Sequence, residues 1–229
     1  MSGLDRWLEE ARDAWKVLRI RASRLTPAPI APDQLASENA TERWRAARAL
    51  IGRPRADFLP QLIRLTGDED PMTRAAAVDA LASWGPTLVL EPVRLALAQS
   101  PAPDAAIALL ELLARLPDPA NRAAIQPWME HDAPDVRAVA FMALAALCDD
   151  ADLPTLRRAL KEEGLPTQRA ILAILCAPGA EPLAQRAANA RDPILSQRGR
   201  QALKRIQQSQ HTGVAKTVSD HVGAESRFS

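Results

Sequence analysis

The stretch Asp132-Ala-Pro-Asp-Val-Arg-Ala-Val-Ala-Phe-Met-Ala-Leu-Ala-Ala-Leu147 contains the pattern from which most of the chain is built. A Pro opens the pattern, an Arg follows three residues later, and small apolar residues with an Ala-Leu pair close it. We call this pattern the Arg frame, and the place three residues after its opening Pro the frame position. Further copies, some of them degenerate, lie at 40–50, 71–81, 103–113, 166–176 and 193–203.

The copies follow one another at a nearly constant distance. Their frame positions are occupied by Arg43, Arg74, Ala106, Arg137, Arg169 and Ser196. The period is therefore about 32 residues, and a fixed period of roughly 20 to 50 residues is typical of a solenoid. We expect an all-α fold, a right-handed α-α superhelix of about five helical pairs plus a terminal helix.

Each unit is predicted to hold a first helix, which carries the Arg frame, and a second helix of about a dozen residues. The second helices have their own recurring proline at positions 60, 92, 154 and 182. Proline is favoured at the first position of a helix because its missing N–H is not needed there. In the third unit Ala123 takes the proline place and Pro127 falls inside, so this helix should start late or be kinked.

Composition narrows the class of protein. Of the 229 residues 47% are hydrophobic and only 3% aromatic, which suits Ala/Leu helices packed closely together. The net charge of +1 is not the strong positive field of a general nucleic-acid binder. The longest apolar run is far shorter than a membrane helix needs. Cys148 and Cys176 fall on predicted apolar faces, so we expect buried reduced thiols and a cytoplasmic location.

Two tryptophans mark a separate segment at the start of the chain. Residues 4–24 have helical apolar spacing, with Trp7 and Trp15 on one side. We expect residues 1–25 to form an amphipathic helix that caps the array or docks a partner, a membrane-surface helix being the third possibility. The remaining predicted segments are a Pro-rich linker at 26–36, the repeat array at 37–207 and a disordered tail at 208–229.

The frame Asp-x-x-Pro-x-Val-Arg-x-x-Ala-x-x-Ala-Leu resembles the HEAT-like repeat named after phycobilisome lyases. Its closest matches are residues 132–137 and 68–74, and the resemblance covers about residues 37–207. It implies a right-handed α-solenoid whose second helices line a concave binding face. It also implies that the frame arginines tie one loop to the next, so we interpret Arg43, Arg74, Arg137 and Arg169 as structural.

Residues that could carry chemistry are scarce. Deoxyhypusine hydroxylases resemble this chain in architecture and bind two irons through His-Glu pairs, whereas this chain has only the reversed pair Glu130-His131. The other histidines, His211 and His221, lie in the predicted tail, and there is no Gly-rich phosphate loop. We expect a protein without catalytic residues, metal or cofactor.

Basic residues recur on the predicted second helices, near the recurring proline. If they face the groove, they form a positive stripe for an acidic partner, and the alternative is a solvated helix face whose charge neighbouring glutamates offset. The candidate partner-binding residues are Arg64, Arg94, Arg157, Arg158, Lys161 and Arg186, with Trp7 and Trp15 as the alternative docking site.

We therefore predict a non-enzymatic scaffold or assembly adaptor, monomeric, that binds a protein partner with an acidic surface on its concave face. Two alternatives stay open. The first is a lyase- or chaperone-type subunit that acts on a cofactor-bearing protein. The second is a HEAT-like nucleic-acid-binding module, including a glycosylase, for which Trp128 would have to line a pocket instead of packing in the core.

Overall fold

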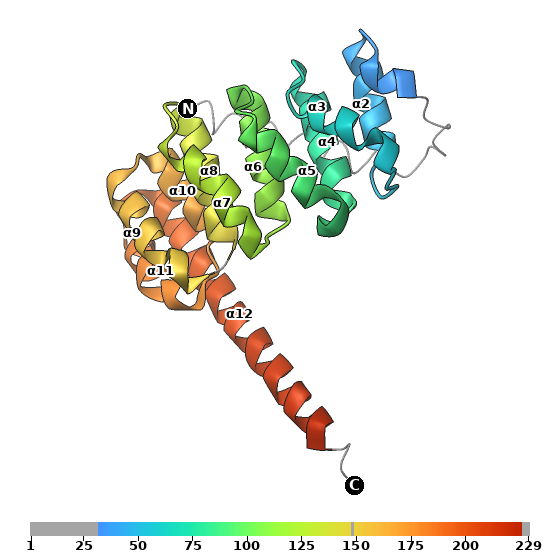
Figure 1. The fold of residues 1–229 in the computed structure, drawn as a ribbon. Coiled ribbons are helices and arrows are strands. Elements are labelled where there is room, and N and C mark those ends of the chain that lie inside the picture. Colours follow the sequence, from blue (N-terminus) through green and yellow to red (C-terminus); the bar gives the residue numbers. More distant parts are fainter. Residues whose placement is uncertain (1–31, 148, 226–229) are drawn as a thin grey trace. The chain divides into compact units, whose positions relative to one another are not determined.

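A computed structural model describes the backbone of residues 32–147 and 149–225 and the side chains of residues 33–147 and 149–209. This part of the chain is built from helices and contains no strand (Figure 1). It is an all-α solenoid of helical pairs, as the repeat period predicted. The predicted N-terminal helix, with Trp7 and Trp15, lies outside the described residues.

Helices that carry the Arg frame alternate with shorter ones. The first helices are α2 (Ala40–Ala49), α4 (Pro71–Ser83), α6 (Pro103–Arg115), α8 (Pro134–Ala146), α10 (Leu165–Ile174) and α12 (Pro193–Glu225). The second helices are α3 (Leu59–Leu65), α5 (Pro86–Ala98), α7 (Arg122–Ile125), α9 (Leu153–Glu162) and α11 (Glu181–Ala188). Short 3-10 turns lie between them: η1 (Pro32–Ala36), η2 (Ala56–Phe58), η3 (Pro119–Asn121), η4 (Gln126–Glu130), η5 (Asp150–Asp152) and η6 (Pro178–Ala180).

The first helices start where the frame predicts. α4, α6, α8 and α12 begin at the opening proline itself, which has no N–H to satisfy. At α4 the carboxylate of Asp70 accepts a hydrogen bond from the Thr73 N–H at 2.8 Å, so a side chain satisfies one of the free donors of the first turn. The frame thus encodes the start of these helices, and at α4 the residue before the proline also caps the helix, whereas the Ala102 N-cap of α6 has no side-chain cap.

The recurring proline lies in the first turn of three second helices, but not in that of the fourth. Pro60, Pro154 and Pro182 lie in the first turns of α3, α9 and α11. Pro92 was expected to begin a helix but lies inside α5, because that helix already starts at Pro86. The predicted break in the third unit is confirmed, since α7 has four residues and becomes the 3-10 turn η4, which contains Pro127.

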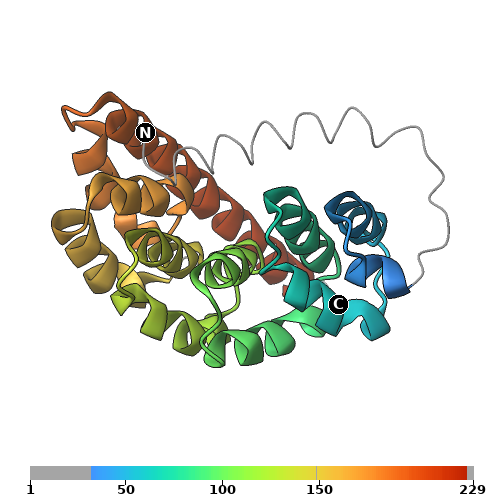
Figure 2. The same ribbon diagram turned by 90° about the horizontal axis from the view of Figure 1, so that it is seen from above.

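The chain divides into two compact units, unit 1 up to Ala143 and unit 2 from Leu144. In unit 1, α2 packs against α4 and α4 against α6, while α3, α5 and α7 follow one another in a second layer (Figure 2). In unit 2, α10 packs against α12, and α12 also packs against α11. In each unit, therefore, the first helices make one layer in which neighbours pack directly.

Small side chains allow these close contacts. Ala47, Ala77 and Leu81 are fully buried, in line with the predicted Ala/Leu core. The closest approach is at Gly199 of α12, where an added Cβ would lie 2.3 Å from the backbone nitrogen of Ala188. The backbones of α11 and α12 therefore meet at a place that only glycine fits.

Two expectations concern the second half of the chain, and one of them needs correction. The backbone of α12 continues to Glu225, into the segment predicted as a disordered tail at 208–229, and that prediction stays untested. No proline follows Pro193, and single glycines weaken a helix without ending it. Cys176 was expected as a reduced thiol, but it is disulfide-bonded. Burial favours a thiol and a disulfide alike, so the apolar pattern could not distinguish them; Cys148 lies outside the described residues.

Candidate functional site

The frame arginines hold together the loops that precede the first helices. Arg43 on α2 donates from Nε to Asp68 Oδ2 at 2.7 Å and from Nη2 to Asp68 Oδ1 at 2.8 Å. Its Nη1 also donates to the backbone oxygens of Ser37 and Glu38, each at 2.9 Å. One side chain thus joins the loop of its own repeat to the loop of the following repeat, as the resemblance implied.

The other frame arginines make contacts of the same kind. Arg74 Nη1 donates to Asp68 O at 2.7 Å and lies 3.7 Å from a carboxylate oxygen of Asp104 in the next repeat. Arg169 Nη2 contacts Asp192 Oδ2 at 3.1 Å, and Asp192 again belongs to the following repeat. These residues are therefore structural and are not available as a shared ligand site.

A second row of polar contacts joins the far ends of the first helices. The indole N–H of Trp84 donates to Leu50 O at 2.9 Å, and Arg115 Nη1 on α6 donates to Asp79 Oδ1 on α4 at 2.7 Å. In unit 2, Arg205 on α12 donates to Leu172 O on α10. This row is not visible in the sequence, because its members differ in residue type from repeat to repeat.

In unit 1 the two candidate arginines differ in their surroundings. Arg64 on α3 is exposed and has no side-chain partner among the described residues. Arg94 on α5 donates to Asn121 Oδ1 at 2.9 Å and lies 3.3 Å from Glu91 and 3.5 Å from Asp118. Arg94 therefore ties α5 to the loop before α7 and is not a free cation for a partner.

The candidate residues of unit 2 lie on neighbouring second helices. The starts of α9 and α11 are held together by the Gly179 N–H, which donates to Asp150 Oδ1 at 2.9 Å. These helices carry exposed cations that make no ion pair or side-chain hydrogen bond within the described part of the chain: Arg157, Arg158, Lys161 and Arg186. Such side chains can reach a partner without breaking a contact of the fold.

The two layers of helices pack differently. The first helices of unit 1 pack against one another more extensively than the second helices do, and in unit 2 α10 packs directly on α12. The expectation that the second helices line a concave face, which the resemblance implied, stays a prediction.

One carboxyl group on the first helices has an unusual environment. Glu111 on α6 is partly buried and makes no hydrogen bond or ion pair with any described residue. Burial raises its pKa to about 7, while nearby Arg115 lowers the pKa and Asp79 raises it. Arg115 is already bonded to Asp79, so it does not neutralise Glu111 directly.

The arrangement offers surfaces for binding, and no constellation for catalysis is recognised among the residues described. A search of these residues finds no group of three His, Cys, Asp or Glu side chains that could hold a metal ion. It also finds no helix that is both long and apolar enough to cross a bilayer. Trp128 is buried, which agrees with core packing and not with an open pocket.

Comparison with protein families identifies the class. HEAT repeats match residues 32–94 and 90–176, so the chain belongs to the HEAT repeat family. A solved structure described as an engineered protein is 18% identical, with a TM-score of 0.43 over 77% of this chain and 95% of that chain. No curated protein matches the sequence. HEAT repeats form helical scaffolds, and the family match brings no positive sign of enzymatic activity.

Proposed function

We propose that the protein is a non-catalytic scaffold or assembly adaptor that binds a protein partner with an acidic surface. The observation that carries this proposal is the set of exposed cations on α9 and α11: Arg157, Arg158, Lys161 and Arg186. Whereas the frame arginines Arg43, Arg74 and Arg169 are bonded internally, these cations have no intramolecular partner among the described residues. Arg is suited to carboxylates because its planar fork donates two parallel hydrogen bonds.

Two details of the proposal extend it. The phycobilisome-lyase subtype of the repeat is proposed on the Asp-Ala-Pro-Asp-Val-Arg motif at 132–137, without a chromophore or an enzymatic step. A monomer in the cytoplasm is proposed on the mixed-charge composition. Subcellular fractionation would decide the location.

The proposal is tested by capturing the partner from the native host with the tagged full-length chain and identifying it by mass spectrometry. One stoichiometric protein is expected, and it should be lost when Arg158 and Arg186 are both changed to Glu. A control with Arg45→Glu and Arg53→Glu changes the charge equally at exposed sites of unit 1 and should retain the partner. Melting curves of both variants show whether the fold is intact.

Several results would contradict the proposal. A co-purified pigment would favour the lyase-type subunit, and binding to DNA with a steep salt dependence would favour the nucleic-acid module. If the charge reversals leave the partner bound while deletion of residues 1–25 removes it, the segment with Trp7 and Trp15 is the docking site instead.

A further inference from the structure

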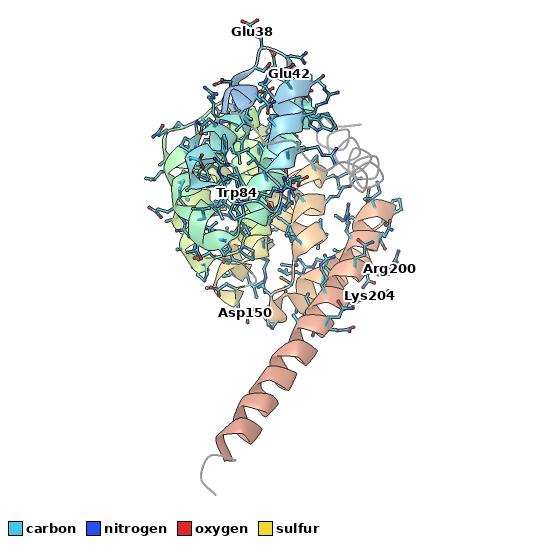
Figure 3. All side chains as sticks on the ribbon, turned by 90° about the vertical axis from the view of Figure 1, so that its right-hand side faces the viewer. Glu38, Glu42, Trp84, Asp150, Arg200 and Lys204 are labelled. Carbon is cyan, nitrogen blue, oxygen red and sulfur yellow. The ribbon has the colours of Figure 1, made fainter. Side chains whose placement is uncertain are left out.

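α12 carries its positive charge on two different flanks. Between Pro193 and Ser209 its basic residues are Arg198, Arg200, Lys204 and Arg205, and this segment contains no acidic residue. Arg198 and Arg205, with Ile194 and Gln201, follow one another at steps of three or four residues and so lie on one side of the helix. We call these four residues the α12 stripe. Arg200 and Lys204 lie on another, exposed flank (Figure 3).

The stripe lies on the layer of first helices in unit 2, beside α10. Arg205 Nη2 donates to Leu172 O, one of the last four carbonyls of α10, which have no acceptor role inside the helix. Its Nε is buried without a hydrogen-bond partner. Arg205 is therefore held in place beside α10, and its Nη1 has no partner among the described residues.

The repeat itself shows which group is missing beside Arg205. Arg115 and Arg205 each lie twelve residues after the opening proline of their frame, and Asp79 and Ile174 each lie eight residues after theirs. In unit 1 this pair of positions holds an ion pair, with Arg115 Nη1 at 2.7 Å from Asp79 Oδ1. In unit 2 the acidic place is taken by Ile174, so Arg205 has no carboxylate on α10.

The positive charge of Arg205 is not offset by a carboxylate among the described residues. Burial lowers its pKa, and the positive charge of Arg198 two turns away lowers it further. α10 contains no acidic residue that could offset these effects. A carboxylate placed beside the stripe would reduce the repulsion and satisfy donors that the fold leaves open.

We propose that the α12 stripe is a docking surface for an acidic helical segment of a partner protein, with Arg198 and Arg205 as its two carboxylate contacts. These arginines are seven positions apart, which is about 10 Å along the helix axis. A partner helix with carboxylates two turns apart matches that separation. Ile194, 45% exposed at one end of the stripe, offers an apolar contact to the same segment. The inference rests on the proposed function and adds to it a surface on the first helices.

A binding assay with a designed peptide tests the stripe on the full-length protein. The probe is a fluorescein-labelled Ala/Leu helical peptide with Glu residues seven positions apart, and its counterpart carries Gln at these places. We expect the Glu peptide alone to raise fluorescence anisotropy at low ionic strength. Arg198→Gln with Arg205→Gln should weaken its binding at least tenfold, about 1.4 kcal/mol.

The matched control removes the same charge from the same helix. Arg200→Gln with Lys204→Gln alters the exposed flank outside the stripe and should weaken the peptide less than about threefold, because long-range attraction alone is lost. Equal weakening by the two double variants would show that only the net charge matters and would overturn the stripe.

A second pair of variants tests the missing carboxylate without removing any arginine. Ile174→Asp supplies on α10 the acid that unit 1 has at Asp79, so it should occupy Arg205 and weaken the peptide. Ile174→Asn removes the same apolar side chain without adding charge, and its affinity should stay close to that of the natural protein. If the Asp and Asn variants bind alike, the proposal is wrong. This comparison stands even where changing Arg205 lowers stability.

The outcome for the stripe can be separated from that for the proposed function. If the protein partner captured from the host is lost on reversal of Arg158 and Arg186 but the stripe variants bind it normally, the stripe proposal fails alone. If no acidic protein is captured and the Glu peptide does not bind, the acidic-partner function fails with it.

Discussion

Arg43 and Asp68 meet through two parallel hydrogen bonds, 2.7 and 2.8 Å long, that join successive repeats of the array. Both side chains are largely buried, with 11% and 7% of their surfaces exposed. The same guanidinium also satisfies two backbone carbonyls of its own loop. Removing either partner would leave buried polar groups without a hydrogen bond.

Changing Asp68 to Asn should therefore destabilise unit 1 by about 2 kcal/mol at neutral pH, since hydrogen bonds to charged groups are the stronger ones. Thermal melts of the natural chain and the variant measure this. Asp57→Asn breaks the exposed pair of Asp57 with Arg55 and should leave the melting temperature unchanged. Equal shifts in the two variants would contradict a special role for the Arg43 pair.

The same pair predicts a dependence on acid. Burial alone would raise the pKa of Asp68, but hydrogen bonds from Arg43 and from the Asp70 N–H outweigh burial and hold the pKa below its usual value of 3.8. A carboxyl with a lowered folded pKa stabilises the protein above its unfolded pKa, and this contribution is lost as pH falls below about 4. The stability difference between the natural chain and Asp68→Asn should shrink over that range in urea unfolding curves.

Glu111 predicts the opposite dependence on pH. Its folded pKa of about 7 lies above its usual value of 4.5, so the charged form is disfavoured in the folded protein. The free energy of unfolding should therefore fall as pH rises from about 4.5 through about 7, by at most about 3 kcal/mol. Glu111→Gln should match the natural chain near pH 4 and exceed it in stability near pH 8. A constant difference at both pH values would show that Glu111 does not titrate in this range.

The approach of α11 to α12 depends on the absence of a side chain. Gly199→Ala would place a Cβ 2.3 Å from Ala188 N and 2.8 Å from Ala184 O, so the two helices must separate. We expect a loss of several kcal/mol, typical of overpacked interiors, seen as an early transition in calorimetry. Gly164→Ala is the matched control, because the nearest atom to its added Cβ is 3.6 Å away. Equal melting of both variants would mean that the contact yields easily.

Register in the core can be tested with one pair of substitutions. Leu81 on α4 is fully buried, and Leu95 on α5 is 58% exposed. Leu81→Asp buries an unpaired charge and should prevent cooperative folding of unit 1, whereas Leu95→Asp should be tolerated. Circular dichroism melts of the two variants distinguish them, and retained cooperative melting of Leu81→Asp would contradict the assigned register.

The repeat and its helices could be predicted from the sequence because they depend on local spacing. A proline followed by Arg at three residues marks the first turn, and Ala/Leu periodicity marks the buried face. Pro92 was misplaced because Pro86 offers an equally good helix start six residues earlier. Local pattern cannot choose between two such starts.

The candidate site was harder to predict, because it depends on distances between helices. Arg94 resembles the other candidate cations in sequence, yet Asn121, 27 residues later, occupies it. Glu111 and Arg205 stand out only when their neighbours on adjacent helices are known. Gly199 could have been noticed as a glycine within a predicted helix, a place where glycine usually marks close packing.

The hydrogen bonds that join one repeat to another connect residues at short distances along the chain. Arg43 contacts a residue 25 positions on, Trp84 one 34 positions back, and Arg115 one 36 positions back. Within the described residues, none of these bonds skips over an intervening repeat. A gene that gains or loses one whole repeat would disturb these bonds only where the new neighbours meet and would leave the others unchanged, so the array could lengthen or shorten in single steps during evolution without a new core.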